Sequence, residues 1–220
     1  MAVGGPVVFT LDWVLLGWSH RGYRPRAETI SSLSAHDASG WPVMVVGQLA
    51  LAAAFVAVAV LLVAGLGRRG WPAAGLLGLA TVGTIQLSAF RTICNRSDVG
   101  WCTPLPHTAY GHEQWLHGTG TAAAFAGLLL ACLATAWGAW PVVELRDLVV
   151  ASVAAEVVAL PFVLWFLANA DDPLDRSWHG FAEKVFFSAL AAWTAYAGIR
   201  LAAVVRAGAG PARTAPGRAS

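Results

Sequence analysis

The chain has 220 residues, of which 57% are hydrophobic and only 12% are charged, and its formal net charge at pH 7 is +2. A soluble domain carries about 25% charged residues because its surface is hydrated. The low charge and a mean hydropathy of +0.62 therefore exclude an ordinary soluble domain. The small net charge, without a basic run, excludes a nucleic-acid-binding protein.

Six apolar runs predict an all-α, polytopic membrane helix bundle with six transmembrane helices. A span needs about 20 apolar residues, and connections rich in Gly, Pro or charge separate the runs. The predicted spans are 4–20, 42–66, 71–91, 117–140, 148–168 and 181–205. The six-helix transmembrane domain occupies 1–206, and the Gly/Pro/Ala/Arg-rich residues 207–220 are predicted to be a disordered cytoplasmic tail.

Two shorter patterns predict local structure. In the polar connection 21–40, the segment ETISSLSA has Ile30 and Leu33 three residues apart, which predicts a turn or two of surface helix. Small residues four apart in the fourth span, Gly118, Ala122 and Ala126, would let another helix pack closely on that face, although in an Ala-rich sequence such spacing also arises by chance.

The orientation of the bundle follows from its connections. With six spans, the polar stretches 21–40, 91–116 and 169–180 share one side, and lysine and arginine residues divide evenly between the two sides. The basic residues of the other side sit in short loops and the tail, where only Glu144 and Asp147 offset them. The three polar stretches also include the longest connection of the chain. We therefore expect a cell-membrane protein with both termini in the cytoplasm.

The longest connection holds Cys94 and Cys102, which are spaced to close a small loop. A pair separated by seven residues matches no common zinc motif. Because disulfides persist in oxidising compartments, we predict a disulfide on the outer side, with metal ligation as the alternative. Cys132 lies within the fourth span and is interpreted as a packing residue.

Polar residues inside the spans suggest a polar interior. Asp12 and Glu156 lie near the middle of their spans, where a carboxylate is costly unless it faces a polar interior. Gln48, Thr84 and Gln86 lie in the outer halves of the second and third spans. We interpret these residues as a pocket or proton path that opens outward. The alternative is that one acid is protonated, or hydrogen-bonded between helices for packing.

Histidines are confined to the predicted outer side. His112, His117 and His179 with an Asp could ligate zinc, which accepts mixed His and carboxylate ligands. Their spacing, however, matches no zinc signature. No nucleophile motif and no phosphate-binding Gly loop is present in the sequence. We therefore predict no resident metal and no cofactor.

Three stretches together carry a family resemblance: GYRPRAETISSLSA, the His-Gly pair that opens the fourth span, and HGFAEKVFFSALAAW. They resemble bacterial and archaeal membrane proteins of domain-of-unknown-function family 998. The segment Gly180–Lys184 is similar to a Gly-Leu-Ala-Glu-Arg pattern, with Phe181 and Lys184 in place of Leu and Arg, and Arg24 stands where the family often has Asp. The resemblance implies a six-helix integral membrane protein and carries no established activity.

The resemblance also sharpens the candidate site, because both motif clusters fall at the outer ends of spans. Together with the start of the fourth span they predict one outward-facing pocket, with candidate ligand-binding residues Glu28, Ser31, His117, His179, Glu183 and Lys184. The alternative for Glu183 and Lys184 is that they only tie the first loop to the last span.

Three functions remain open at this point. The first is a membrane module that binds or transports a lipid or small amphiphile. The second is an enzyme acting on a lipid at the outer leaflet, with His117 or Glu183 as acid–base group or metal ligand. The third is a structural partner of another membrane protein. The expected partners are membrane lipids and a small amphiphilic ligand, and the oligomeric state is open. No inverted repeat supports an alternating-access transporter.

Overall fold

The computed structural model describes residues 1–20, 23–36, 38–92, 111–168 and 178–208, and every element within them is helical. The α-helices are α1 (Gly4–Ser19), α2 (Trp41–Leu66), α3 (Trp71–Ala89), α4 (Gly111–Ala139), α5 (Arg146–Ala168) and α6 (His179–Gly208). Three short 3-10 helices are η1 (Ile30–Ser34), η2 (Gly67–Gly70) and η3 (Val143–Leu145). The predicted all-α class is confirmed, although α4 begins at Gly111 rather than at 117.

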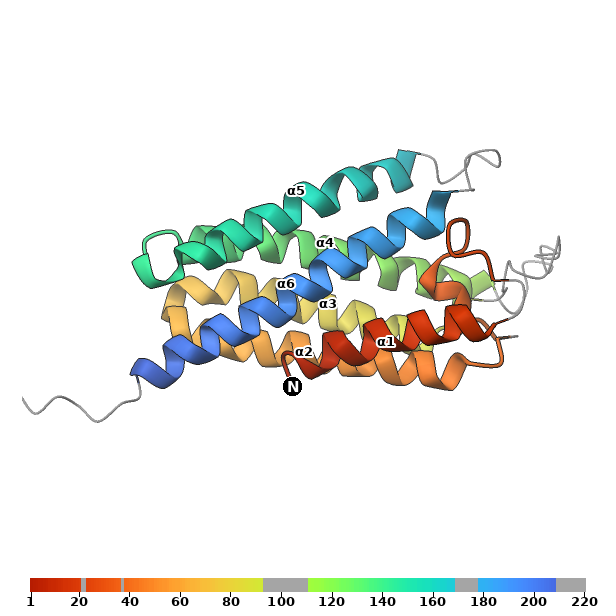
Figure 1. Cartoon of the computed structure of the whole chain (residues 1–220), viewed down its shortest axis with the longest axis horizontal. Coiled ribbons are helices and arrows are strands. Elements are labelled where there is room, and N and C mark those ends of the chain that lie inside the picture. Colours follow the sequence, from red (N-terminus) through yellow and green to blue (C-terminus); the bar gives the residue numbers. More distant parts are fainter. Residues whose placement is uncertain (21–22, 37, 93–110, 169–177, 209–220) are drawn as a thin grey trace, which may run out of the picture.

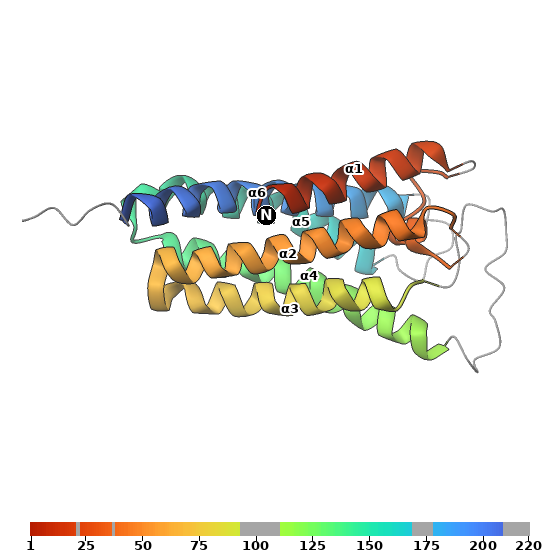
Figure 2. The ribbon, with the colours of Figure 1, turned by 90° about the horizontal axis from the view of Figure 1, so that it is seen from below.

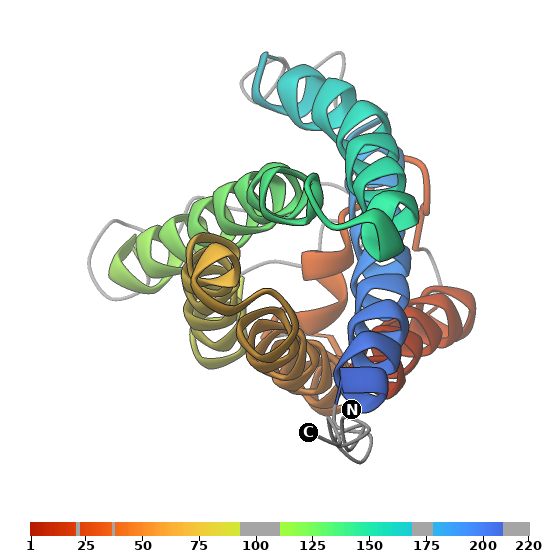
Figure 3. The same cartoon turned by 90° about the vertical axis from the view of Figure 1, so that its left-hand side faces the viewer.

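The helices form an elongated bundle in which each helix packs against the next in chain order (Figure 1). The last helix, α6, also packs against α2 and α1, so the bundle closes on itself when viewed along its length (Figure 3). Two tight connections, through η2 and η3, lie at the same end, which we call the hairpin end (Figure 2). At the opposite end, the loop end, α1, α3 and α5 finish and α2, α4 and α6 begin.

Four stretches of the described residues are long and apolar enough to cross a membrane: Trp41–Ala89, Gly111–Ala139, Val143–Trp165 and His179–Ala207. The first of them contains both α2 and α3 with the turn η2 between them. Many large apolar side chains of these stretches face outward, for example Val46, Val60 and Val82, which are 60–62% exposed. The structure therefore supports a membrane-embedded helical protein.

The first helix is shorter than a full span. It has 16 residues, whereas a bilayer crossing needs about 20. It begins beside the middle of α2, because a Cβ on Gly5 would overlap the carbonyl oxygen of Ala50, and Figure 1 shows it reaching only from mid-bundle to the loop end. The count of six crossings therefore stays a prediction.

Close helix contacts depend on glycine on one face of α4. A Cβ on Gly127 would lie 2.7 Å from the backbone nitrogen of Ala80, and one on Gly120 would lie 3.1 Å from the carbonyl oxygen of Gly83. These small residues let the backbones of α3 and α4 approach each other closely. At the hairpin end, Asp147 accepts hydrogen bonds from Tyr196 (2.7 Å) and Arg200 (3.2 Å), which join α5 to α6. The core that results positions the loop-end residues on rigid helices.

Candidate functional site

The first loop, residues 23–36, folds back into the loop end of the bundle. Within it, η1 is buried, since Ile30 and Leu33 are each only 2% exposed, and it packs against α1, α2 and α6. The prediction of a surface helix is therefore wrong. The periodic apolar residues insert between the helices, and the Ile30 N–H donates to the Glu183 carboxylate of α6.

The N-terminus of α6 is capped by this loop. The Gly180 N–H donates to the Ala27 carbonyl (3.3 Å), and the Phe181 N–H donates to the Arg26 carbonyl (2.9 Å). These bonds satisfy amides that a helix leaves free at its start. A Cβ on Gly180 would overlap the backbone of Glu28, so only glycine permits this approach. The motif glycine is therefore a packing requirement.

Lys184 completes the tie between loop and helix. Its Nζ donates to the carbonyls of Pro25 (2.8 Å), Glu28 (2.6 Å) and Gly180 (3.2 Å), which uses all three of its donors. The nitrogen also lies 5.1 Å from the centre of the Tyr23 ring. Burial, together with nearby carboxylates, raises the pKa of Tyr23, so its phenol stays protonated and donates to the Glu28 carbonyl (3.2 Å). Lys184 thus holds loop backbone and is not among the residues that line the cavity described next.

A second set of bonds joins the loop to α3 and α4. His36 Nε2 lies 2.8 Å from the Glu113 carboxylate, and Arg91 donates to His36 Nδ1 (3.0 Å). The His36 backbone N–H donates to the Thr92 carbonyl (3.2 Å). The first loop therefore bridges three helices and forms a roof over the space between them.

Beneath this roof lies a cavity of about 710 Å³ between α4, α5 and α6. Its upper part is polar and is lined by Glu28, Thr29, Ser31, Ser32, Thr92, Gln114, His117, His179 and Glu183. Its lower part is lined by Gly118, Ala122, Phe125, Ala126, Leu129, Leu160, Val163 and Leu164. We call this space the loop-end cavity. Five of the six predicted ligand-binding residues line it, all except Lys184; that they bind a ligand stays a prediction.

The hydrogen bonds of His117 define its tautomer. Its Nδ1 lies 2.8 Å from the Phe90 carbonyl oxygen. A carbonyl can only accept, so Nδ1 carries the proton and Nε2 of the neutral ring is an acceptor. The side chain is 5% exposed and lines the loop-end cavity. His117 therefore contributes an acceptor that could take a proton or a hydrogen bond from a ligand.

The apolar part of the loop-end cavity is a slot between α4 and α5. Its α4 wall is the stripe Gly118, Ala122 and Ala126, and a Cβ on Gly118 would meet nothing within 4 Å. The prediction that a helix packs closely on this stripe is wrong, because α3 packs against a different face of α4. From His117 to Leu129 the wall runs about 18 Å along the helix axis.

The glutamines predicted to share one polar interior are separated. Gln48 accepts from Ser88 Oγ (3.1 Å) and, with Thr84, lines a small cavity of about 20 Å³ that also touches Ser31 and Glu183. Gln86 instead donates to the Leu116 carbonyl of α4 (2.7 Å). Gln48 and Thr84 thus lie next to residues of the loop-end cavity, whereas Gln86 joins α3 to α4.

The two predicted intramembrane acids also lie apart. Asp12 sits against Gly47 of α2, whereas Glu156 is one turn from Leu160 on α5. Glu156 is 8% exposed, so it faces the bundle interior rather than lipid. Within the described residues, Asp12 Oδ2 and Glu156 Oε2 are buried without a hydrogen-bond partner. A continuous polar path that includes both acids stays a prediction.

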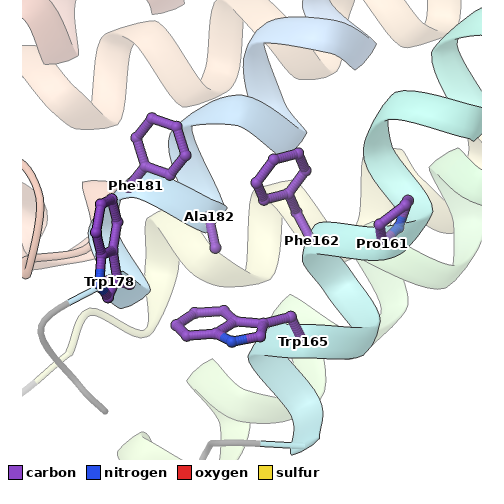
Figure 4. A pocket seen from close by; sticks show the side chains of 6 residues that line it. All are labelled: Pro161, Phe162, Trp165, Trp178, Phe181 and Ala182. Carbon is purple, nitrogen blue, oxygen red and sulfur yellow. The ribbon is translucent and has the colours of Figure 1, made fainter.

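A second hollow lies between the loop-end halves of α5 and α6 (Figure 4). It measures about 570 Å³, and Pro161, Phe162, Trp165, Trp178, Phe181 and Ala182 line it. The Arg26 guanidinium lies 3.4 Å from the centre of the Trp178 ring. Sequence reasoning missed this hollow, although two aromatic pairs three residues apart were a usable signal: Phe162 and Trp165 on α5, and Trp178 and Phe181 at the start of α6. Its aromatic lining is typical of side chains at a membrane interface.

The remaining sequence predictions concern cysteines and metals. Cys94 and Cys102 lie outside the described residues, whereas Cys132 is fully buried in α4. No group of three or more His, Cys, Asp or Glu side chains that could hold a metal ion occurs in the part of the chain that the structure describes. His112, one of the histidines considered as a zinc ligand, stacks on Trp115 with the ring centres 6.1 Å apart.

Comparison with known proteins identifies the family of the chain. A family model described as "Protein of unknown function (DUF998)" matches residues 2–215. Neither a curated protein nor a solved structure matches the chain. The matched range includes the first loop, the start of α4 and the start of α6, which together build the loop-end cavity.

Proposed function

We propose that this chain, which belongs to the family described as protein of unknown function DUF998, binds a lipid or other small amphiphile of the membrane. The observation that carries the proposal is the loop-end cavity, which is polar under the first loop and apolar along α4 and α5. Its volume of about 710 Å³ lies within the range of about 300–1,000 Å³ that is usual for small-ligand sites.

The slot offers a route from the bilayer. Leu160 and Leu164 of α5 line it and are 37% and 56% exposed, and Ala122 and Ala126 on the facing wall are exposed as well. An amphiphile that enters between α4 and α5 keeps its chain in apolar surroundings and brings its head beneath the first loop. The amphiphile can therefore reach the cavity from the bilayer without passing through water.

The proposal includes an orientation in the cell membrane. The chain crosses six times, with the loop end outside and both termini in the cytoplasm. The apolar surface of the helices and the tight connections at the hairpin end support this placement. A head group in the outer leaflet then lies level with Glu28, Ser31 and His117.

A matched pair of variants tests the proposal. Ala122→Leu fills the slot, whereas Ala53→Leu adds the same side chain at an exposed position of α2 outside it. Purified protein in neutral detergent is titrated with a fluorescent single-chain amphiphile. We expect Ala122→Leu to weaken binding at least tenfold and Ala53→Leu to leave it unchanged. Equal binding by both variants would reject the cavity as the site.

The acceptor on His117 favours one alternative, an enzyme acting on a lipid at the outer leaflet. In that case Nε2 would serve as a general base. Chemical turnover of a co-purified lipid, lost in His117→Ala, would favour the enzyme. Binding without turnover in the unmodified protein favours the binding module.

A further inference from the structure

We infer that the small cavity beneath η1 holds one ordered water molecule, which bonds to Gln48 of α2, Thr84 of α3 and Thr121 of α4. This inference does not depend on the proposed function, because it concerns a different space from the one that would take an amphiphile. It follows from the size of the small cavity, its enclosure and the direction of the hydrogen-bonding groups that line it.

The small cavity has the size of one water molecule and lies inside the bundle. Its volume is about 20 Å³, and about 10–15 Å³ is enough to admit one water. Buried apolar side chains form much of its lining, among them Phe9, Ile30 and Leu51, which are each 2% exposed. A polar group that faces this space therefore needs a partner within it.

Gln48 supplies a buried donor to the small cavity. The residue lines this space and is 5% exposed. Its Oε1 accepts from Ser88 Oγ (3.1 Å), whereas its amide nitrogen donates to no group of the described residues. Buried polar side-chain atoms nearly always have a hydrogen-bond partner, which is an ordered water where the protein supplies none. The amide of Gln48 therefore indicates a water in the adjoining space.

Two threonines supply acceptors to the same space. Thr84 Oγ1 donates its hydrogen to the Ala80 carbonyl (2.8 Å), and Thr121 Oγ1 donates its hydrogen to the His117 carbonyl (3.0 Å). A hydroxyl group has one hydrogen and two lone pairs, so each oxygen remains an acceptor. Both threonines line the small cavity. A water that donates to both and accepts from Gln48 makes three hydrogen bonds, which is typical of a buried water.

The same groups disfavour an ion. A cation cannot accept from the Gln48 amide, and an anion cannot donate to the threonine oxygens. Glu183, which also lines the small cavity, already accepts from the Ile30 and Ser31 amides and interacts electrostatically with Lys184. Because burial of an uncompensated charge is costly, a neutral molecule that both donates and accepts fits this lining best.

A water in this position connects three helices directly beneath the first loop. Ser31 and Thr121 line both the small cavity and the loop-end cavity. The water therefore supports part of the wall that separates the loop-end cavity from the core of the bundle.

Radiolytic footprinting tests the site, because X-rays convert bound water into hydroxyl radicals that oxidise the side chains beside it. The purified full-length protein is irradiated in detergent, and oxidation is located by peptide mass spectrometry. Phe9 and Phe55 form a matched pair, since they are 2% and 1% exposed and, of the two, only Phe9 lines the small cavity. We expect Phe9 to be oxidised at least fivefold faster than Phe55. Equal rates would overturn the inference.

Variants assign the oxidation to the water. Thr84→Val removes an acceptor and should slow the oxidation of Phe9 at least threefold. Thr194→Val is the control, because Thr194 is also buried and also donates to the carbonyl four residues earlier, that of Leu190 (2.7 Å), but does not line the small cavity. Gln48→Leu removes the donor and should act like Thr84→Val, which keeps the test decisive if the threonine variant does not fold. A Phe9 rate that the folded cavity variants leave unchanged, or that Thr194→Val lowers equally, contradicts the water site.

Discussion

Gly180 marks the point at which the two most distant motifs of the family resemblance meet. Its missing side chain lets the Glu28 backbone lie against the first turn of α6, and the Ala27 carbonyl then caps that turn. The sequence identified both motifs and predicted that they converge. It could not show that the contact is made by backbone atoms, because a motif records residue types and not the groups that touch.

Substitution of this glycine should loosen the contact. In Gly180→Ala the new methyl group overlaps the Glu28 backbone, and overpacking of this kind costs about 1–3 kcal/mol. We expect a lower thermal unfolding midpoint in detergent. The control is Gly75→Ala on α3, where a Cβ meets nothing within 4 Å and the midpoint should stay the same or rise. Equal midpoints for the two variants would contradict the packing role.

Glu156 offers a second test at the scale of one residue. Its Oε2 is buried without a hydrogen-bond partner in the described part of the chain, and an unsatisfied buried polar group costs about 1–3 kcal/mol. We therefore expect Glu156→Leu to raise the thermal unfolding midpoint. One turn away, Ser152 accepts from Trp193 Nε1 (2.9 Å), so Ser152→Ala should lower it. A destabilised Glu156→Leu would show that the carboxyl has a structural partner.

At the scale of helices, the sequence predicted which segments are helical better than which faces pack. Small residues four apart marked Gly118, Ala122 and Ala126 as a packing face, yet this stripe lines a cavity. Gly120 and Gly127, on another face of the same helix, carry the contact with α3. In an Ala-rich helix several faces have small residues, and only the position of the neighbouring helix decides between them.

The first loop illustrates the same limit. The spacing of Ile30 and Leu33 predicted a helical turn, and η1 is present. The spacing could not show that this turn is buried, because a short turn with two apolar residues can lie on the protein surface or between helices. The turn is buried by α1, α2 and α6, and its hydrogen-bond partner on α6, Glu183, lies about 150 residues further along the chain.

The bonds between Lys184 and the first loop predict a measurable effect when this lysine is substituted. In Lys184→Met the carbonyls of Pro25 and Glu28 lose their shared donor, so the segment 23–36 should open more often. Hydrogen exchange measured by mass spectrometry should be faster in this segment and unchanged in α3. Lys184→Arg, which keeps the charge and the donors, is the control and should exchange more slowly than the methionine variant. Identical exchange in all three proteins would reject the tie.

For the whole molecule, composition and apolar runs were sufficient to predict an all-α membrane protein, and each predicted span corresponds to one helix. The number of crossings stays a prediction, because α1 has 16 residues and starts beside the middle of α2. Sequence length alone could not reveal this, since a run of apolar residues does not show where along its neighbours a helix begins. The cavity itself arises from three helices and a loop and has no local signature.

Orientation is testable with single cysteines. In a background of Cys94→Ser, Cys102→Ser and Cys132→Ala, Arg26→Cys places the single thiol at the loop end and Arg69→Cys places it at the hairpin end, both at exposed positions. In intact cells a membrane-impermeant maleimide should label the first variant and not the second. Labelling should reach both after the membrane is permeabilised. The reverse pattern would place the termini outside.

The central claim is that an amphiphile occupies the space between α4 and α5 beneath the first loop. The most direct measurement is covalent mapping with a photoreactive single-chain amphiphile added to the purified protein, followed by peptide mass spectrometry. We predict adducts within 117–129 and 160–164, and their loss in the Ala122→Leu variant. Adducts confined to the second hollow at Trp178 and Phe181, or spread evenly over the outer faces of the helices, would contradict the account.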